Sequence, residues 1–136
     1  MIIKEFDIDF VLSIVFTQQK RYLLRKNGYN YYSDEWIFSS RLLIERDGVK
    51  YSAPTGTHTL QVFCEKGTKC VKCGVEGGYF AAEESGINKA VLNLYTNDDV
   101  LMTKDHIIPK SYGGGNYISN YQPMCKICNN KKANKW

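Results

Sequence analysis

The chain has 136 residues, of which 43% are hydrophobic and 24% charged, and this fits one globular domain with a modest core. No apolar run approaches the roughly 20 residues that span a bilayer, and the acidic start of the chain lacks a signal-peptide layout, so we expect a cytoplasmic protein. The net charge is +4, and residues 101–136 contain six lysines against one acid. Such a basic end favours a polyanionic partner, although a solvated lysine-rich tail has the same composition.

Apolar spacing predicts helices in the first part of the chain. A helix is expected over residues 6–26, with Gly28 as its stop. A second is expected over residues 33–46, where Ser33 precedes two acids in the manner of an N-cap. We therefore predict that residues 1–65 form a helical N-terminal region of unknown role.

A loop and a short helix complete this region. Residues 49–56 contain Pro and Gly and are predicted as a loop. The short helix after them is expected to begin at Thr57 or Thr59 and to end at Gly67.

The periodicity changes to that of strands after residue 66. The expected elements are, in order, an extended stretch at 79–84, a strand at 90–96, a turn at 97–99, a strand at 100–108 that Pro109 ends, a glycine-rich loop at 111–116 and a final helix at 126–134.

Four of the five cysteines form two Cys-x-x-Cys pairs that Gly74 and Asn129 follow: Cys70, Cys73, Cys125 and Cys128. Disulfides are rare in the cytosol, whereas four thiolates make a closed tetrahedral site for Zn²⁺. The alternative is a redox dithiol, against which the presence of two pairs argues. Because 51 residues separate Cys73 from Cys125, a small subdomain must lie between the two halves of the site.

A second group of residues suits phosphodiester hydrolysis. Asp105 offers a carboxylate and Asn129 an amide oxygen, the kinds of ligand that Mg²⁺ prefers. Histidine is a common base at neutral pH, so His106 can act as a base toward water. Adjacent strand residues point to opposite faces, so some local distortion is needed before both can face one reaction centre. Taken alone, the Asp105-His106 pair is also typical of a surface turn, and Asn129 is also typical of a helix cap.

Residues 105–132 are similar to the HNH endonucleases of the ββα-metal class, in the variant with asparagine in place of the final histidine. The motif is DHIIPKS, then GG, then an asparagine, then QPMCKICNNKK, and the zinc-stabilised members extend the likeness back to the CVKCG segment. The resemblance implies that Asp105 and Asn129 bind Mg²⁺ or Mn²⁺. It also implies that His106 is the general base. Asn120 would brace the loop between strand and helix and so help to orient His106.

The predicted architecture is α+β. The helical region at 1–65, which the apolar spacing predicts, is followed by the ββα-metal nuclease domain with structural zinc that the resemblance implies at 66–136. The implied activity is DNA cleavage, and the family's usual products are a 5′-phosphate and a 3′-hydroxyl. Small members of this type resemble phage-encoded or mobile-element nucleases, which would act in a bacterial host cell. Five lysines are expected to contact DNA phosphates, with a solvated helix face as the alternative: Lys110, Lys126, Lys131, Lys132 and Lys135.

Two other functions remain open on the sequence. One is a non-catalytic zinc-binding nucleic-acid module, which would have no reason to keep Asp105, His106 and Asn129 together. The other is a phage structural or regulatory protein, which the basic end disfavours. The DNA target, nicking against double-strand cleavage and the oligomeric state have no signal in the sequence.

Overall fold

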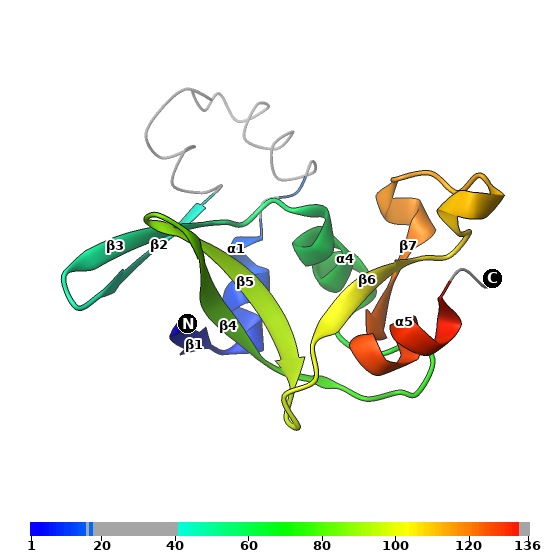
Figure 1. The fold of residues 1–136 in the computed structure, drawn as a ribbon, viewed down its shortest axis with the longest axis horizontal. Coiled ribbons are helices and arrows are strands. Elements are labelled where there is room, and N and C mark those ends of the chain that lie inside the picture. Colours follow the sequence, from blue (N-terminus) through cyan, green and yellow to red (C-terminus); the bar gives the residue numbers. More distant parts are fainter. Residues whose placement is uncertain (16, 18–40, 134–136) are drawn as a thin grey trace.

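The structure is a computed structural model that describes residues 1–15, 17 and 41–133. Its elements follow one another in the order shown in Figure 1: β1 (Ile2–Phe6), α1 (Ile8–Ile14), β2 (Arg41–Arg46), β3 (Val49–Pro54), α4 (His58–Lys66), β4 (Gly77–Gly86), β5 (Lys89–Thr96), β6 (Met102–His106), the 3₁₀ turns η1 (Lys110–Tyr112) and η2 (Ile118–Asn120), β7 (Tyr121–Cys125) and α5 (Lys126–Lys132). In this part of the chain no helix is long and apolar enough to cross a membrane.

The described strands form two sheets. The larger has the order β1-β4-β5-β3-β2, with antiparallel neighbours except for the parallel contact of β3 with β5. The smaller is the antiparallel pair β6-β7. Strands from both sides of residue 65 share the larger sheet, so the regions 1–65 and 66–136 are joined by backbone hydrogen bonds. Their assignment as separate functional units stays a prediction.

The N-terminal part of the chain is strand-rich, and the prediction of a helical region is wrong for most of its described residues. Of the helix expected at 6–26, only α1 is present among the residues described, and β1 precedes it as an edge strand. The predicted helix 33–46 is contradicted at residues 41–46, which form β2, while residues 33–40 lie outside the described part. The predicted loop 49–56 is mostly β3.

The turn between β2 and β3 explains this error. Asp47 and Gly48 have φ of 53° and 77°, the positive values that a tight hairpin turn of the Asp-Gly type requires. Leu42 and Ile44 face the core from one side of β2, whereas Leu43 between them is 56% exposed. The adjacent apolar residues Leu43 and Ile44 suggested a helical face, but the Asp-Gly pair dictates a hairpin.

The short helix was predicted correctly. Thr57 is the N-cap of α4, and its hydroxyl accepts a hydrogen bond from the Leu60 N–H at 3.3 Å. Gly67 ends the helix with φ of 91°. The helix lies between the large sheet and the β6-β7 pair (Figure 1) and contacts both β6 and β7.

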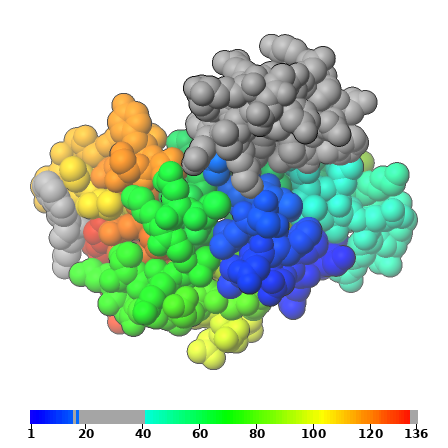
Figure 2. Space-filling model, turned by 180° about the vertical axis from the view of Figure 1, so that it is seen from behind, coloured from blue at the N-terminus to red at the C-terminus, as the bar shows by residue number. Residues whose placement is uncertain are grey.

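One hydrophobic core connects these layers. Val11 and Val15 are fully buried, and the first lies in α1, which packs on β4 and α4. Phe63 of α4 meets Phe80 of β4 with their ring centroids 6.3 Å apart. Figure 2 shows the N-terminal segment (blue) in direct contact with the green and cyan parts of the chain. The site-bearing elements β6, β7 and α5 are thus attached to a scaffold that the N-terminal residues help to build.

Candidate functional site

The four cysteines of the two Cys-x-x-Cys pairs come together. Their Sγ atoms all lie within 4.8 Å of one another, as the ligands of one metal ion would. Gly74, at φ of 80°, lets the first pair turn tightly, and its N–H donates to the Cys70 carbonyl at 3.0 Å. The Val71 N–H donates to the carbonyl of Pro123 in β7 at 3.1 Å, which brings the first pair against the second. A four-thiolate set of this kind fits Zn²⁺.

The pKa values of the thiols in this cluster are shifted in opposite directions. Burial opposes ionisation of Cys70, but backbone N–H groups, that of Cys125 foremost, outweigh it and lower the pKa of Cys70 to about 6. The hydrogen bond with Cys125 and then burial raise the pKa of Cys128 to about 12, and burial raises the pKa of Cys125. Cys70 is therefore the thiol that loses its proton more readily than Cys125 and Cys128 do. A soft dication can replace the thiol protons with metal–sulfur bonds.

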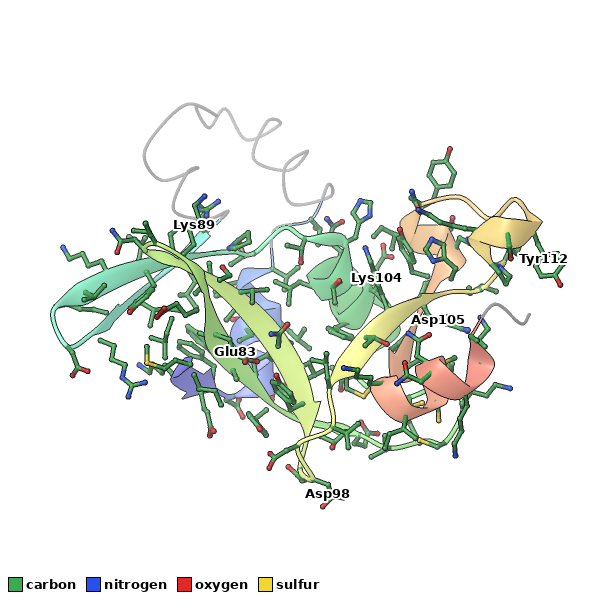
Figure 3. All side chains as sticks on the ribbon, in the orientation of Figure 1. Glu83, Lys89, Asp98, Lys104, Asp105 and Tyr112 are labelled. Atoms are coloured by element: carbon green, nitrogen blue, oxygen red, sulfur yellow. The ribbon has the colours of Figure 1, made fainter. Side chains whose placement is uncertain are left out.

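The β6-β7 pair carries the Asp-His dipeptide. In its register Asp105 lies opposite Gln122 and His106 opposite Tyr121, so each functional side chain has a cross-strand neighbour. In Figure 3, Lys104 and Asp105 leave β6 in different directions, and Asp105 is on the side of α5. Asp105 and His106 nevertheless line the same cavity, because β6 ends at His106 and the chain turns there.

Asp105 is a buried carboxylate, 7% exposed. Its Oδ2 accepts hydrogen bonds from Gln122 Nε2 at 2.9 Å and from the Lys132 ammonium at 2.6 Å. Lys132 also donates to the His106 carbonyl at 2.7 Å, and its side chain is only 8% exposed. Lys132 thus neutralises Asp105 from α5. Lys132 is therefore paired with Asp105 in this structure, and its contact with a DNA phosphate stays a prediction.

His106 is held by two residues that sequence reasoning had not singled out for that role. Its Nε2 lies 2.9 Å from Asn116 Oδ1, and its ring meets the Tyr121 ring edge-on with centroids 4.9 Å apart. An amide oxygen only accepts, so this contact places the proton on Nε2. The lone pair of Nδ1 is then available as a base.

Asn120 closes the loop between β6 and β7. Its Oδ1 accepts from the Ile108 N–H at 2.9 Å, and its Nδ2 donates to the carbonyls of Ile108 at 3.1 Å and Gly115 at 2.9 Å. A Cβ at Gly114 would lie 1.7 Å from the Ile108 oxygen, so the close backbone approach inside this loop requires glycine. Asn120 contacts backbone rather than the cavity.

The hydrogen bond between Asn129 and Thr103 shows which end of the Asn129 amide carries the oxygen. The Thr103 hydroxyl donates its single proton to the Met124 carbonyl at 2.7 Å. It can therefore only accept from Asn129, whose Nδ2 lies 2.8 Å away. The amide nitrogen of Asn129 faces Thr103, and the amide oxygen faces the other way. Together with the Asp105 carboxylate, this oxygen makes a donor set that fits Mg²⁺ or Mn²⁺.

These groups open into one cavity of about 260 Å³, whose lining contains Asp105, His106 and Asn129 with the cations Lys104, Lys110 and Lys132. Burial, and secondarily the charge of Lys110, lower the pKa of Lys104. Lys104 also lies over the Tyr121 ring, 4.6 Å from its centroid. The cavity lining contains three lysines and one carboxylate, and this excess of positive charge attracts an anion.

The other predicted lysines take different places. Lys110 lines the cavity, whereas Lys126 and Lys131 are exposed on α5 and do not line it. Lys135 lies outside the described residues. Lys104 was missed, although period-two alternation puts it on the strand face of His106, which is the signal that would have found it.

Comparison with known families agrees with this arrangement. Residues 95–136 match the family model described as HNH endonuclease. The C-terminal segment of the chain is thus an HNH endonuclease segment by this match. The match contains β6, the loop, β7 and α5, and therefore all the cavity residues named above.

An HNH segment suggests nuclease activity with metal binding and a nucleic-acid substrate. Cys70 and Cys73 precede the matched residues, so the first half of the cysteine cluster is joined to the HNH segment by the fold alone. Comparison with curated proteins and with solved structures found no match.

Proposed function

We propose that this HNH protein is a DNA endonuclease that uses one Mg²⁺ or Mn²⁺ held by Asp105 and Asn129. The observation that carries the proposal is the shared cavity, which joins these hard oxygen donors with the free Nδ1 of His106 and a lysine-rich lining. When bound, the dication neutralises and polarises a phosphodiester. The basic lining supplies attraction for the DNA backbone.

His106 is proposed as the general base. A water at Nδ1 loses its proton to the imidazole while its oxygen attacks phosphorus. The bond from phosphorus to the 3′-oxygen breaks, and the 3′-oxygen takes a proton from solvent. The products are a 5′-phosphate and a 3′-hydroxyl. Asn116 and Tyr121 keep the ring in place, and Asn120 keeps the loop that carries Asn116 closed.

The lysines at the cavity are proposed to bind DNA phosphates. Lys104 and Lys110 both line it, and the charge of Lys110 already disfavours protonated Lys104, so a phosphate between them would relieve the repulsion. Exposed Lys126 and Lys131 extend the basic surface along α5. These contacts read charge rather than sequence.

Zinc is proposed as the structural metal of the cysteine cluster. It would tie the first Cys-x-x-Cys pair to the start of α5, where Cys125 is the N-cap and Cys128 lies one residue before Asn129. The orientation of Asn129 then depends on the zinc site through the helix. The zinc ligands are distinct from the proposed catalytic donors.

Plasmid nicking tests the catalytic proposal. Purified protein is incubated with supercoiled plasmid in Mg²⁺ or Mn²⁺, with an EDTA control. His106→Ala should lower the cleavage rate by about 10²–10⁴, the usual contribution of a general base. The matched control is His58→Ala, because His58 is the second histidine of the chain and is exposed at the start of α4.

Equal cutting by His106→Ala, or no cutting in any divalent metal, would reject the catalytic proposal. Binding of DNA without cleavage would favour the non-catalytic zinc-binding module instead.

Elemental analysis tests the zinc proposal. The purified chain should contain one zinc, Cys73→Ser should contain much less, and Cys64→Ser should keep it because Cys64 lies outside the cluster. A zinc content far below one per chain in the unaltered protein would contradict the four-cysteine site.

A further inference from the structure

The contact of Lys132 with Asp105 has consequences for metal binding. The two side chains are each 8% exposed, and the ammonium is 2.6 Å from Oδ2. Lys132 follows Asn129 by three residues on α5, so both side chains project from one helix face toward β6. The ammonium and the two proposed metal donors therefore meet in a single cavity.

An ammonium and a dication cannot both occupy this carboxylate without a penalty. The Oδ2 atom already accepts two hydrogen bonds, from Lys132 and Gln122, which use both of its lone pairs. A dication on the same carboxylate would lie a few ångströms from the ammonium, in surroundings that screen like charges poorly. The unfavourable energy falls if the lysine leaves, and Lys132 has a long flexible stem.

We propose that Lys132 is an exchangeable counter-ion of Asp105, which a divalent cation displaces when it binds. This inference rests on the proposed metal site at Asp105 and Asn129 and adds its regulation. Lys132 keeps the buried carboxylate paired, which is stabilising, and it competes with the metal, which weakens metal affinity. Once displaced, its ammonium faces the same basic cavity and adds one positive charge for a DNA phosphate.

Metal titration of a charge-removing variant tests the competition without DNA. Mn²⁺ binding to zinc-loaded protein is measured by calorimetry for the unaltered chain, Lys132→Met, Lys131→Met and Asp105→Asn. Lys132→Met keeps the length of the stem and should bind Mn²⁺ about tenfold tighter or more. Lys131→Met, an exposed neighbour, should match the unaltered chain. Unchanged or weaker binding by Lys132→Met would overturn the proposal.

Lysine labelling of the unaltered protein provides a second test that does not depend on how a variant folds. Acetylation followed by mass spectrometry should show slow labelling at Lys132 and a several-fold increase when Mg²⁺ is added, with Lys126 and Lys131 unchanged. Labelling of Lys132 that does not respond to Mg²⁺ would overturn the exchange.

The two proposals fail in different ways. If Asp105→Asn leaves Mn²⁺ binding unaltered, the metal site itself is wrong and the exchange falls with it. If Asp105→Asn abolishes binding while Lys132→Met leaves the affinity unchanged, the metal site stands and the counter-ion role alone is rejected.

Discussion

The Thr103 hydroxyl has one proton, and it donates that proton in a hydrogen bond to the Met124 carbonyl. This hydrogen bond determines the orientation of the Asn129 amide, because the hydroxyl oxygen can then only accept from the Asn129 amide nitrogen. Thr103, which precedes the motif at 105–132, thereby determines which side of the Asn129 amide is the oxygen side. Partners of this kind commonly change metal affinity by 10- to 100-fold.

Thr103→Val should weaken Mn²⁺ binding about tenfold, because valine has the shape of threonine but leaves the Asn129 amide free to rotate. Zinc content should not change, since Thr103 is not part of the cysteine cluster. Calorimetric titration with Mn²⁺ measures the effect, and Thr59→Val on α4 serves as the matched control. An unchanged Mn²⁺ affinity in Thr103→Val would contradict the role of Asn129 as a ligand.

Asp105 and His106 show what a motif conveys and what it omits. Their adjacency in the chain is visible in the sequence and predicts a base beside a metal ligand. Their partners come from the register of β6 on β7, which pairs Asp105 with Gln122 and His106 with Tyr121. No local spacing predicts such cross-strand neighbours, because register depends on how the whole hairpin packs. The direction of Lys132 toward Asp105 was missed for the same reason.

At the scale of elements, the β4-β5 pair carries a polar network on its less buried face. The Tyr95 hydroxyl donates to Glu83, and Asn93 Nδ2 donates to the same carboxylate oxygen at 3.0 Å. The rings of Tyr79 and Tyr95 stack with centroids 5.6 Å apart. The hydrogen bond to Glu83, followed by burial, raises the pKa of Tyr95 to about 12.

This raised pKa predicts alkaline destabilisation. Below about pH 10, the ordinary pKa of tyrosine, the hydroxyl is protonated in both folded and unfolded chains, so the bond contributes fully. As the pH rises from there to about 12, the unfolded chain loses the proton first and the contribution falls. Tyr95→Phe should be less stable by roughly 1 kcal/mol below pH 10, and the difference should close near pH 12.

Urea unfolding at several pH values measures this difference. Tyr117→Phe is the control, because Tyr117 is 71% exposed. A gap between the unaltered chain and Tyr95→Phe that persists or widens above pH 11 would contradict the assignment.

The β2-β3 hairpin shows how much of the fold was predictable. Asp47-Gly48 is a strong hairpin signal that the sequence contains, and the helix expected over 33–46 overlooked it. The α4 helix was predicted from its cap and its stop, both local features. The pairing of β1 with β4 was not predictable, because a five-residue strand at the start of the chain carries no information on its distant partner.

At the scale of the whole molecule, the N-terminal elements and the HNH elements share one core. Ile3, Val11 and Phe63 are buried against Phe80 and Leu94. In addition, the Lys66 ammonium at the end of α4 donates to the carbonyl of Ser119 at 3.4 Å and to that of Tyr121. The last residue of α4 therefore supports the loop that contains Asn120.

A chain limited to residues 66–136 should lose cooperative unfolding even when zinc-loaded. Removing β1 and α1 uncovers β4, and removing α4 leaves the core without Phe63, whose loss alone typically costs about 3–5 kcal/mol. Thermal melts followed by circular dichroism, with the full chain as control, measure this. A cooperative melt of the fragment at the temperature of the full chain would instead support an independent domain at 66–136.

The candidate site could be predicted from the sequence because its groups are chain neighbours or follow short fixed spacings: Asp105-His106, the two Cys-x-x-Cys pairs, and the asparagines at 120 and 129. Short separations along the chain do not depend on the tertiary structure. The fold alone brought the two cysteine pairs together, joined the N-terminal strands to the HNH elements and turned Lys132 onto Asp105. Those outcomes depend on strand register and on core packing between residues far apart in the chain, and that information is distributed over the whole sequence.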